Sequence, residues 1–294
     1  MVMKPEVFIK SNCINAEGPV WDDRTQTFYF IDVEAGKVFS YKDEKLTVWK
    51  AGEKVGFAVL NEDGGVIAGL QSGFCAVDFP DGGFRILADP EKDMPGNRFN
   101  DGKADPFGRL FGGTLTMTRP EGAEGPLAAL YRLDKKENGY EAVKVIDKVG
   151  LSNGLAWNAD RTKMYFVDTD AGTVAEYKYD PSTGEIGEGR VIIAVPSEMG
   201  FPDGMSIDEN GKLWVALWNG GAISQWDPET GELLQKIDLP VKNVSSCCFG
   251  GPDMDILFIT TASQDTDTAQ YPLAGNVFCM KPGVKGEKSY RAAI

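Results

Sequence analysis

The chain has 294 residues, of which 42% are hydrophobic and 11% aromatic, so it can bury a substantial core in one large or two small domains. A formal net charge of −14 makes a nucleic-acid backbone or an anionic membrane an unsuitable partner. There is no run of about 18 apolar residues, and the opening segment MVMKPEVFIK lacks the apolar core of a signal peptide. The five cysteines are odd in number, which argues against a disulfide framework, so we expect a cytoplasmic protein.

The sequence contains no histidine. Ser-His-Asp and Cys-His catalysis, a histidine general base and histidine-ligated zinc are therefore excluded. Any chemistry has to use carboxylates, amides, hydroxyls, thiols, lysine, tyrosine or a metal ion held by oxygen ligands.

One phrase recurs six times along the chain: an Asp or Asn near a turn, a Gly or polar gap, and then a compact hydrophobic strand. The six stretches start about 40 to 53 residues apart, the spacing of propeller blades. They are DDRTQTFYFID from Asp22, EDGGVIAGL from Glu62, DPFGRLFGGT from Asp105, NADRTKMYFVDT from Asn158, DENGKLWVAL from Asp208 and GPDMDILFITT from Gly251.

Each phrase has a short strand-like segment before it and another after it, and most repeats contain a fourth. Three or four strands in each of six repeats predict an all-β fold, a six-bladed β-propeller forming a single domain over residues 1–294. The sixth repeat lacks a clear fourth strand, and EVFIK (residues 6–10) is expected to supply it and close the ring. The alternative is a β-sandwich with coincidental spacing.

The residue five positions before the start of each phrase lies on the first strand of its repeat. First strands line the central channel of a propeller, so these six residues are expected to form a ring at one mouth of the channel. The ring consists of Glu17, Phe57, Asn100, Asn153, Asp203 and Ser246.

Four of these six residues carry a carboxylate or an amide. Converging buried carboxylates destabilise a fold unless a cation compensates them. Oxygen ligands suit a hard ion, so the ring predicts a metal site in the central channel for one divalent ion, with Ca²⁺ favoured and Mg²⁺, Mn²⁺ or Zn²⁺ as alternatives. Each motif alone has an ordinary explanation, because Asn153-Gly154 and Asp203-Gly204 are common turn dipeptides. Their shared register favours a site.

Two further features lie near the ring in this arrangement. Arg98 precedes Asn100 by two residues, and a cation there would suit a polar substrate or an oxyanion, although a solvated arginine is the ordinary alternative. Residues 116–128, TMTRPEGAEGPLA, are expected to form either a mobile lid or a solvated loop.

Several phrases are shared with one known family: AEGPVW, NRFNDGKADPFG, LSNGLAW, FPDGMSIDENGKLWVA, SSCCFGG and GVKG. By these phrases the chain resembles the family of regucalcin (senescence marker protein), gluconolactonases and luciferin-regenerating enzymes. The resemblance implies a propeller with one divalent ion held by Glu17, Asn153 and Asp203. It also implies substrate contacts from Arg98 and Asn100, with Asp203 as the general base.

The lid departs from the family pattern. A glutamate that helps bind the sugar lactone in regucalcin-like members aligns with Thr118, which becomes the candidate substrate contact there, although Glu121 or Glu124 could substitute. The preference for sugars is therefore open.

These observations predict a metal-dependent hydrolase that opens a small lactone, with a small-molecule lactone or ester as its partner and a monomer or weak dimer as its assembly. The ion would polarise the carbonyl, and Asp203 would take a proton from the attacking water. Alternatives are a luciferin-regenerating enzyme, a phosphotriesterase-like hydrolase, and a calcium-binding propeller without catalysis.

Overall fold

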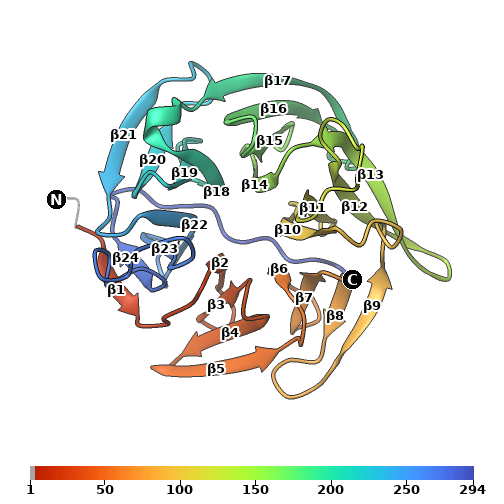
Figure 1. Ribbon diagram of the computed structural model, residues 1–294, viewed down its shortest axis with the longest axis horizontal. Coiled ribbons are helices and arrows are strands. Elements are labelled where there is room, and N and C mark those ends of the chain that lie inside the picture. Colours follow the sequence, from red (N-terminus) through yellow and green to blue (C-terminus); the bar gives the residue numbers. More distant parts are fainter. Residues whose placement is uncertain (1–3) are drawn as a thin grey trace.

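The structure, a computed structural model, describes residues 4–294 and consists of six four-stranded sheets arranged around a central axis (Figure 1). The first three residues of the opening segment lie outside the described residues. The predicted all-β six-bladed propeller is confirmed, and the alternative of a β-sandwich is wrong.

The first three blades follow the chain from its N-terminal part, each running from its innermost to its outermost strand. Blade 1 contains β2 (Ala16–Asp22), β3 (Thr27–Asp32), β4 (Lys37–Lys42) and β5 (Lys45–Lys50). Blade 2 contains β6 (Val55–Leu60), β7 (Val66–Leu70), β8 (Gly73–Val77) and β9 (Phe84–Ala88). Blade 3 contains β10 (Asn97–Ala104), β11 (Leu110–Thr116), β12 (Ala128–Lys136) and β13 (Gly139–Val149).

The remaining blades complete the ring, and the last one combines both ends of the chain. Blade 4 contains β14 (Ser152–Trp157), β15 (Lys163–Asp168), β16 (Thr173–Tyr179) and β17 (Ile186–Ala194). A short 3₁₀ helix, η1 (Ser197–Met199), leads to blade 5, which contains β18 (Phe201–Ile207), β19 (Leu213–Trp218), β20 (Ala222–Trp226) and β21 (Leu233–Asp238). Blade 6 contains β22 (Asn243–Gly250), β23 (Ile256–Ala262), β24 (Val277–Met280) and β1 (Glu6–Ile9).

The position of a strand in its blade explains its sequence. The inner strands β6 and β7 are buried at every residue, because the neighbouring blades cover both of their faces. The outermost strand β21 is exposed or half-exposed along its whole length and has polar residues between its apolar ones. The core therefore lies between blades, and a buried cluster joins residues of blades 5, 6 and 1.

Blade 6 is closed by the N-terminal strand, as predicted. Strand β1 pairs antiparallel with β24, and Glu6 lies opposite Cys279. Phe8 packs across the seam between blades 6 and 1, with its ring centroid 4.9 Å from that of Phe258 and 5.1 Å from that of Tyr41. Pairing the two ends of the chain removes the free sheet edges that an open ring would leave.

The seam gives a test of how much this closure contributes to stability. Phe8→Ala is expected to lower the free energy of unfolding by about 2–3 kcal/mol, because it removes a partly buried ring from an aromatic cluster. Urea denaturation measures the change. Ile86→Ala, on the outer strand β9 and 49% exposed, is the control and should change stability by less than about 0.5 kcal/mol. An equal effect of the two substitutions would contradict a stabilising role for the closure.

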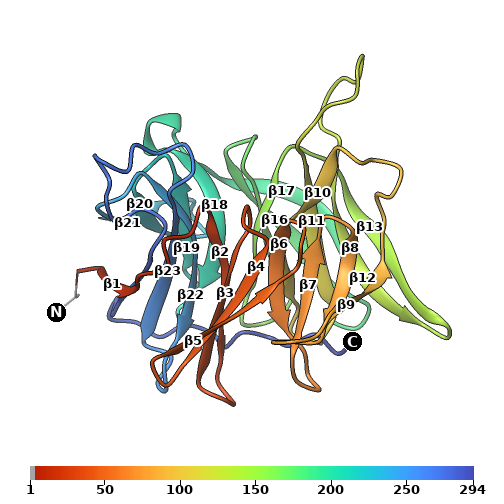
Figure 2. The same ribbon diagram turned by 60° about the horizontal axis from the view of Figure 1, so that its bottom comes forward.

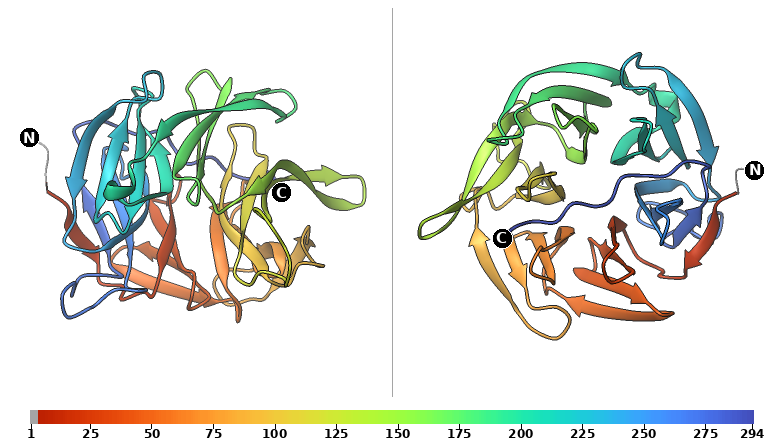
Figure 3. Two further views of the ribbon diagram at one scale, coloured as in Figure 1. Left: turned by 45° about the horizontal axis from the view of Figure 1, so that its top comes forward. Right: turned by 180° about the vertical axis from the view of Figure 1, so that it is seen from behind.

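The two faces of the propeller differ. On the upper face, where the first strands begin, the loop of residues 117–127 between β11 and β12 projects away from the ring (Figure 2). On the lower face, the C-terminal segment 285–294, here called the strap, crosses the middle of the ring (Figures 1 and 3). No helix within residues 4–294 is long and apolar enough to cross a membrane.

Backbone hydrogen bonds fix the strap to opposite sides of the ring. Near blades 5 and 6 its carbonyl at Lys285 accepts from the Glu209 N–H at 2.8 Å. At its far end Ala292 exchanges hydrogen bonds with blade 2, and the Ala293 N–H donates to the Gly108 carbonyl of blade 3 at 2.8 Å. The strap therefore covers the lower mouth of the channel.

Candidate metal and substrate site

Every first strand has a register shift beside its ring position. In β18 the shift lies between Pro202 and Met205, so Asp203 and Gly204 together face one residue of β19. Corresponding shifts occur in the other five first strands. Such bulges redirect side chains. The polar residues at these positions therefore do not follow the regular alternation of side chains between the two faces of the sheet.

The expected ring position of blade 2 is wrong by one residue. The turn after β6 starts at Asn61, whose N–H donates to the Gly65 carbonyl, and Leu60 pairs with Val66. Counting back from Asn61 reaches Gly56 rather than Phe57. A Cβ at Gly56 would lie 2.3 Å from the carbonyl oxygen of Phe99, so blade 2 contributes no side chain to the ring. Phe57 is buried in the core instead.

Glu17 and Asp203 are buried carboxyls, 8% and 7% exposed. Burial, and then the nearby Asp203 and Asp101, raise the pKa of Glu17 well above its ordinary value. Burial and the nearby Asp101 likewise raise the pKa of Asp203. The backbone N–H of Gly18 donates a hydrogen bond to Glu17 Oε2 at 2.6 Å. These carboxyls lie close enough to repel one another, which a cation would relieve.

The amide of Asn153 has a fixed orientation. Its Nδ2 donates to Thr169 Oγ1 at 2.9 Å, and that hydroxyl donates to the Pro202 carbonyl at 2.7 Å. No hydrogen bond to Asn153 Oδ1 is present within the described residues, so this oxygen is available as a ligand. A second layer of hydrogen bonds that fixes a ligand in this way is typical of metal sites.

Asn100 differs from Asn153. Its Oδ1 accepts from Arg98 Nη1 at 2.9 Å, and its Nδ2 donates to the Ser152 carbonyl at 2.9 Å. An amide oxygen bound to a guanidinium is a poor ligand for a second cation. This arrangement favours Asn100 as a substrate contact rather than a metal ligand.

Thr118 lies at the base of the projecting loop and its side chain is exposed. Its N–H donates to the Gly96 carbonyl at 3.2 Å, and it lines a surface hollow together with residues 93–97. It does not take part in the hydrogen bonds that join Arg98 to Asn100. The structure brings together Glu17, Arg98, Asn100, Asn153 and Asp203. The role of Thr118 as a substrate contact stays a prediction.

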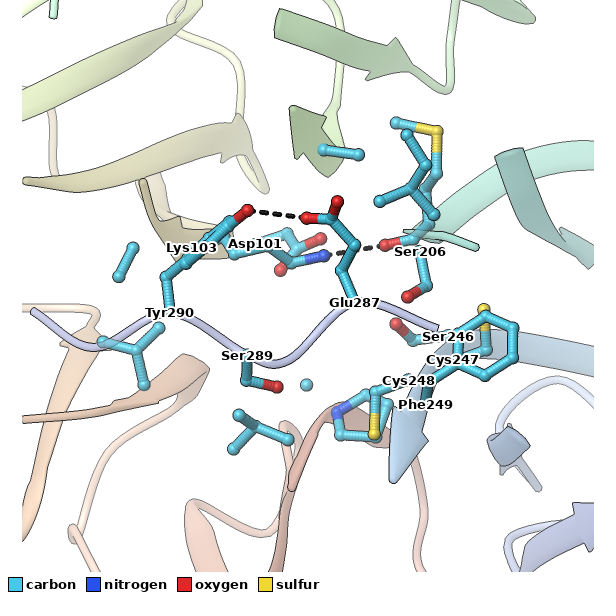
Figure 4. A pocket seen from close by; sticks show the side chains of 18 of the residues that line it. Asp101, Lys103, Ser206, Ser246, Cys247, Cys248, Phe249, Glu287, Ser289 and Tyr290 are labelled. Atoms are coloured by element: carbon cyan, nitrogen blue, oxygen red, sulfur yellow. Dashed lines mark hydrogen bonds between the residues drawn. The ribbon is translucent and has the colours of Figure 1, made fainter. Parts of the chain in front are cut away.

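Below the ring lies a cavity of about 70 Å³, and residues of the strap form part of its lining (Figure 4). Glu287 and Tyr290 of the strap line it, and the Tyr290 hydroxyl donates to Glu287 Oε2 at 2.6 Å. From blade 3, Asp101 and Lys103 also line it, and Lys103 Nζ donates to the Met205 carbonyl at 2.8 Å. The sequence reasoning missed Lys103, although its spacing from Asp101 places both side chains on one side of β10.

The residues present fit a divalent ion. Two buried carboxyls and an oriented amide oxygen supply the hard oxygen ligands that Ca²⁺ or Mg²⁺ prefers. Within residues 4–294 no three His, Cys, Asp or Glu side chains form a group with metal-ligand geometry. The proposed ligands are Glu17, Asp203 and the amide oxygen of Asn153. Asparagine is not one of these four residue types, so the three ligands would not form a group of that kind.

Residues 15–263 match the family described as SMP-30/Gluconolactonase/LRE-like region. The chain belongs to this family. Curated members include bovine (Bos taurus) regucalcin, 38% identical with 98% of each chain covered, and human regucalcin, 36% identical with 99% of each covered.

Solved structures place the fold in the same SMP-30/gluconolactonase group. A luciferin-regenerating enzyme has a TM-score of 0.89 at 29% identity, with each chain fully covered. A regucalcin from Agrobacterium tumefaciens, described as a calcium-binding protein, has a TM-score of 0.90 at 25% identity and covers 100% of this chain and 98% of its own.

Proposed function

We propose that this chain is a divalent-metal-dependent lactonase, with Ca²⁺ as the favoured ion. One observation carries the proposal. Two buried carboxyls, Glu17 and Asp203, and the oriented amide oxygen of Asn153 lie on the inner strands of the same channel. Glu17, Asn153 and Asp203 would hold the ion. Membership of the SMP-30/gluconolactonase family supports a small lactone as the substrate.

The residues around the ring have distinct roles in the proposed hydrolysis. When bound, the ion would polarise the substrate carbonyl as a Lewis acid. Asp203 takes a proton from the attacking water and returns it to the ring oxygen as the carbon–oxygen bond breaks. Arg98 and Asn100, already joined by a hydrogen bond, orient the lactone. The product is the open hydroxy acid, so no other reactant is needed.

Removal and return of metal tests the proposal directly. The protein treated with a chelator should not hydrolyse gluconolactone, and adding Ca²⁺, Mg²⁺, Mn²⁺ or Zn²⁺ one at a time should restore turnover with at least one ion. Release of acid, followed with a pH indicator, measures the rate. Activity that survives full removal of metal would contradict the metal requirement. Tight binding of one ion without turnover of any lactone would favour a calcium-binding propeller without catalysis.

A further inference from the structure

Two charged side chains below the ring have no role in the proposed hydrolysis. Asp101 and Lys103 both lie on β10 and line the cavity (Figure 4). Strand β10 pairs regularly with β11 from Asp101 to Ala104, so residues two positions apart share one face. Asp101 is 8% exposed, and within residues 4–294 its side chain accepts only the Gly102 N–H, at 2.7 Å. The fold thus places a carboxyl and an amine together inside the channel.

Lys103 reaches across the channel from blade 3 to blade 5. Its Nζ donates to the Met205 carbonyl of β18 at 2.8 Å. No other hydrogen bond and no ion pair of this ammonium is present within residues 4–294, so two of its three N–H donors remain for the cavity. Burial lowers the pKa of Lys103, and the carboxylates of Asp101 and Glu17 oppose this change. The negative charge that compensates the ammonium therefore acts through space rather than by direct contact.

Asp101 also acts on the two carboxyls proposed to hold the ion. Together with burial, which is the larger cause, its repulsion contributes to the raised pKa values of Glu17 and Asp203. Burial raises the pKa of Asp101 itself, and among the influences that lower it Lys103 is the largest. Three carboxyls therefore share one stretch of the channel. Calcium sites tune their affinity through the number of charged ligands, so a third carboxylate would tighten binding unless another charge offset it.

We propose that Lys103 is a built-in counter-charge of the ion site, which offsets Asp101, keeps that carboxyl out of the ligand set and weakens the binding of the ion. Lys103 is a positioning residue, because it touches neither the substrate nor the ion and acts through Asp101 and through its own charge. The inference rests on the ion site of the proposed lactonase and adds to it the residue that sets its affinity.

Calorimetric titration of the chelator-treated protein with Ca²⁺ tests the inference. Lys103→Met removes the charge at similar length and should lower the Kd for Ca²⁺ about 10- to 100-fold, since one positive charge near a divalent ion is lost. Lys103→Gln, which keeps a donor for the Met205 carbonyl, should do the same if the methionine variant does not fold. Circular dichroism and thermal unfolding establish which variants are folded.

A double-mutant cycle separates the charge effect from a packing effect. Asp101→Asn should raise the Kd about 10-fold, and the double variant with Lys103→Met should return close to the wild type, because opposite charges are removed together. In chelator, the Tm of the double variant should lie above the sum of the two single shifts, since each single change leaves a buried charge without its partner. Additive shifts in Tm would overturn the pairing.

The control is Lys144→Met on β13 of the same blade, whose side chain is 49% exposed and whose loss should leave the Kd unchanged. A folded Lys103→Met protein that binds Ca²⁺ no more tightly than the wild type would overturn the inference, because Lys103 would then only connect blades 3 and 5. The measurement does not depend on turnover. Tighter binding in Lys103→Met supports the inference even if no lactone is hydrolysed, whereas a wild type that binds no Ca²⁺, Mg²⁺, Mn²⁺ or Zn²⁺ would overturn both proposals.

Discussion

Asp203→Asn is expected to lower kcat at saturating metal by about 10²–10⁴-fold, the usual contribution of a general base. The substitution keeps the size of the side chain and one possible oxygen ligand but removes the proton acceptor. It also removes one of the two carboxylates proposed to hold the ion, so metal affinity should fall together with kcat. Initial rates of gluconolactone hydrolysis, measured over a metal titration, separate the two effects.

The matched control is Asp160→Asn, an exposed carboxylate in the turn between β14 and β15, which should leave both parameters unchanged. Full turnover by Asp203→Asn at saturating metal would remove Asp203 from the role of base. A large loss of metal affinity with normal kcat would make it a ligand alone.

The fold could be predicted from the sequence because every blade repeats the same local pattern. Short apolar strands separated by turn residues leave few architectures open, and the missing fourth strand of the last repeat pointed to residues 6–10. The error in blade 2 has a local cause. Glu62 is acidic like Asp22, Asp105 and Asp208 at the turns of three other repeats. The turn of blade 2 nevertheless begins at Asn61, so the ring position moves by one residue from Phe57 to Gly56.

The separate roles proposed for the two asparagines could not be read from spacing. Asn100 and Asn153 occupy equivalent positions, and the difference comes from Arg98 on one amide and Thr169 on the other. Each partner is set by the local path of the backbone, which a pattern of residue types does not specify. The family resemblance assigned the same roles, and the hydrogen bonds supply a physical reason for that assignment.

The position of the strap across the ring, and the cavity above it, could not be predicted from the sequence. Residues 285–294 lack the alternation of a strand, and their hydrogen bonds are with residues such as Glu209 and Gly108 that are distant along the chain. Lys103 becomes notable only because the strap encloses the channel beneath it. Such features depend on closure of the whole ring.

Glu17→Gln is expected to stabilise the metal-free protein while abolishing its stabilisation by metal. Glu17 is a buried carboxyl beside Asp203 and Asp101, so neutralising it relieves a repulsion that no protein cation compensates fully. A gain of about 1–3 kcal/mol in metal-free stability would raise Tm by about 2–4 °C for each kcal/mol. In the wild type, metal at 100 times its Kd should instead add about 2.7 kcal/mol, which the variant should not gain.

The pH dependence of this effect has a definite sign. Because the folded-state pKa of Glu17 is raised above 4.5, the metal-free folded protein binds the proton more tightly than the unfolded chain. Its stability should therefore fall as pH rises from about 4.5 through the raised pKa, and Glu17→Gln should flatten this fall. Thermal unfolding in chelator at a series of pH values measures it, with the exposed Glu188→Gln as the control. If Glu17→Gln destabilised the metal-free protein at neutral pH, the carboxylate would be compensated by the protein itself, and the argument for a bound ion would lose its energetic basis.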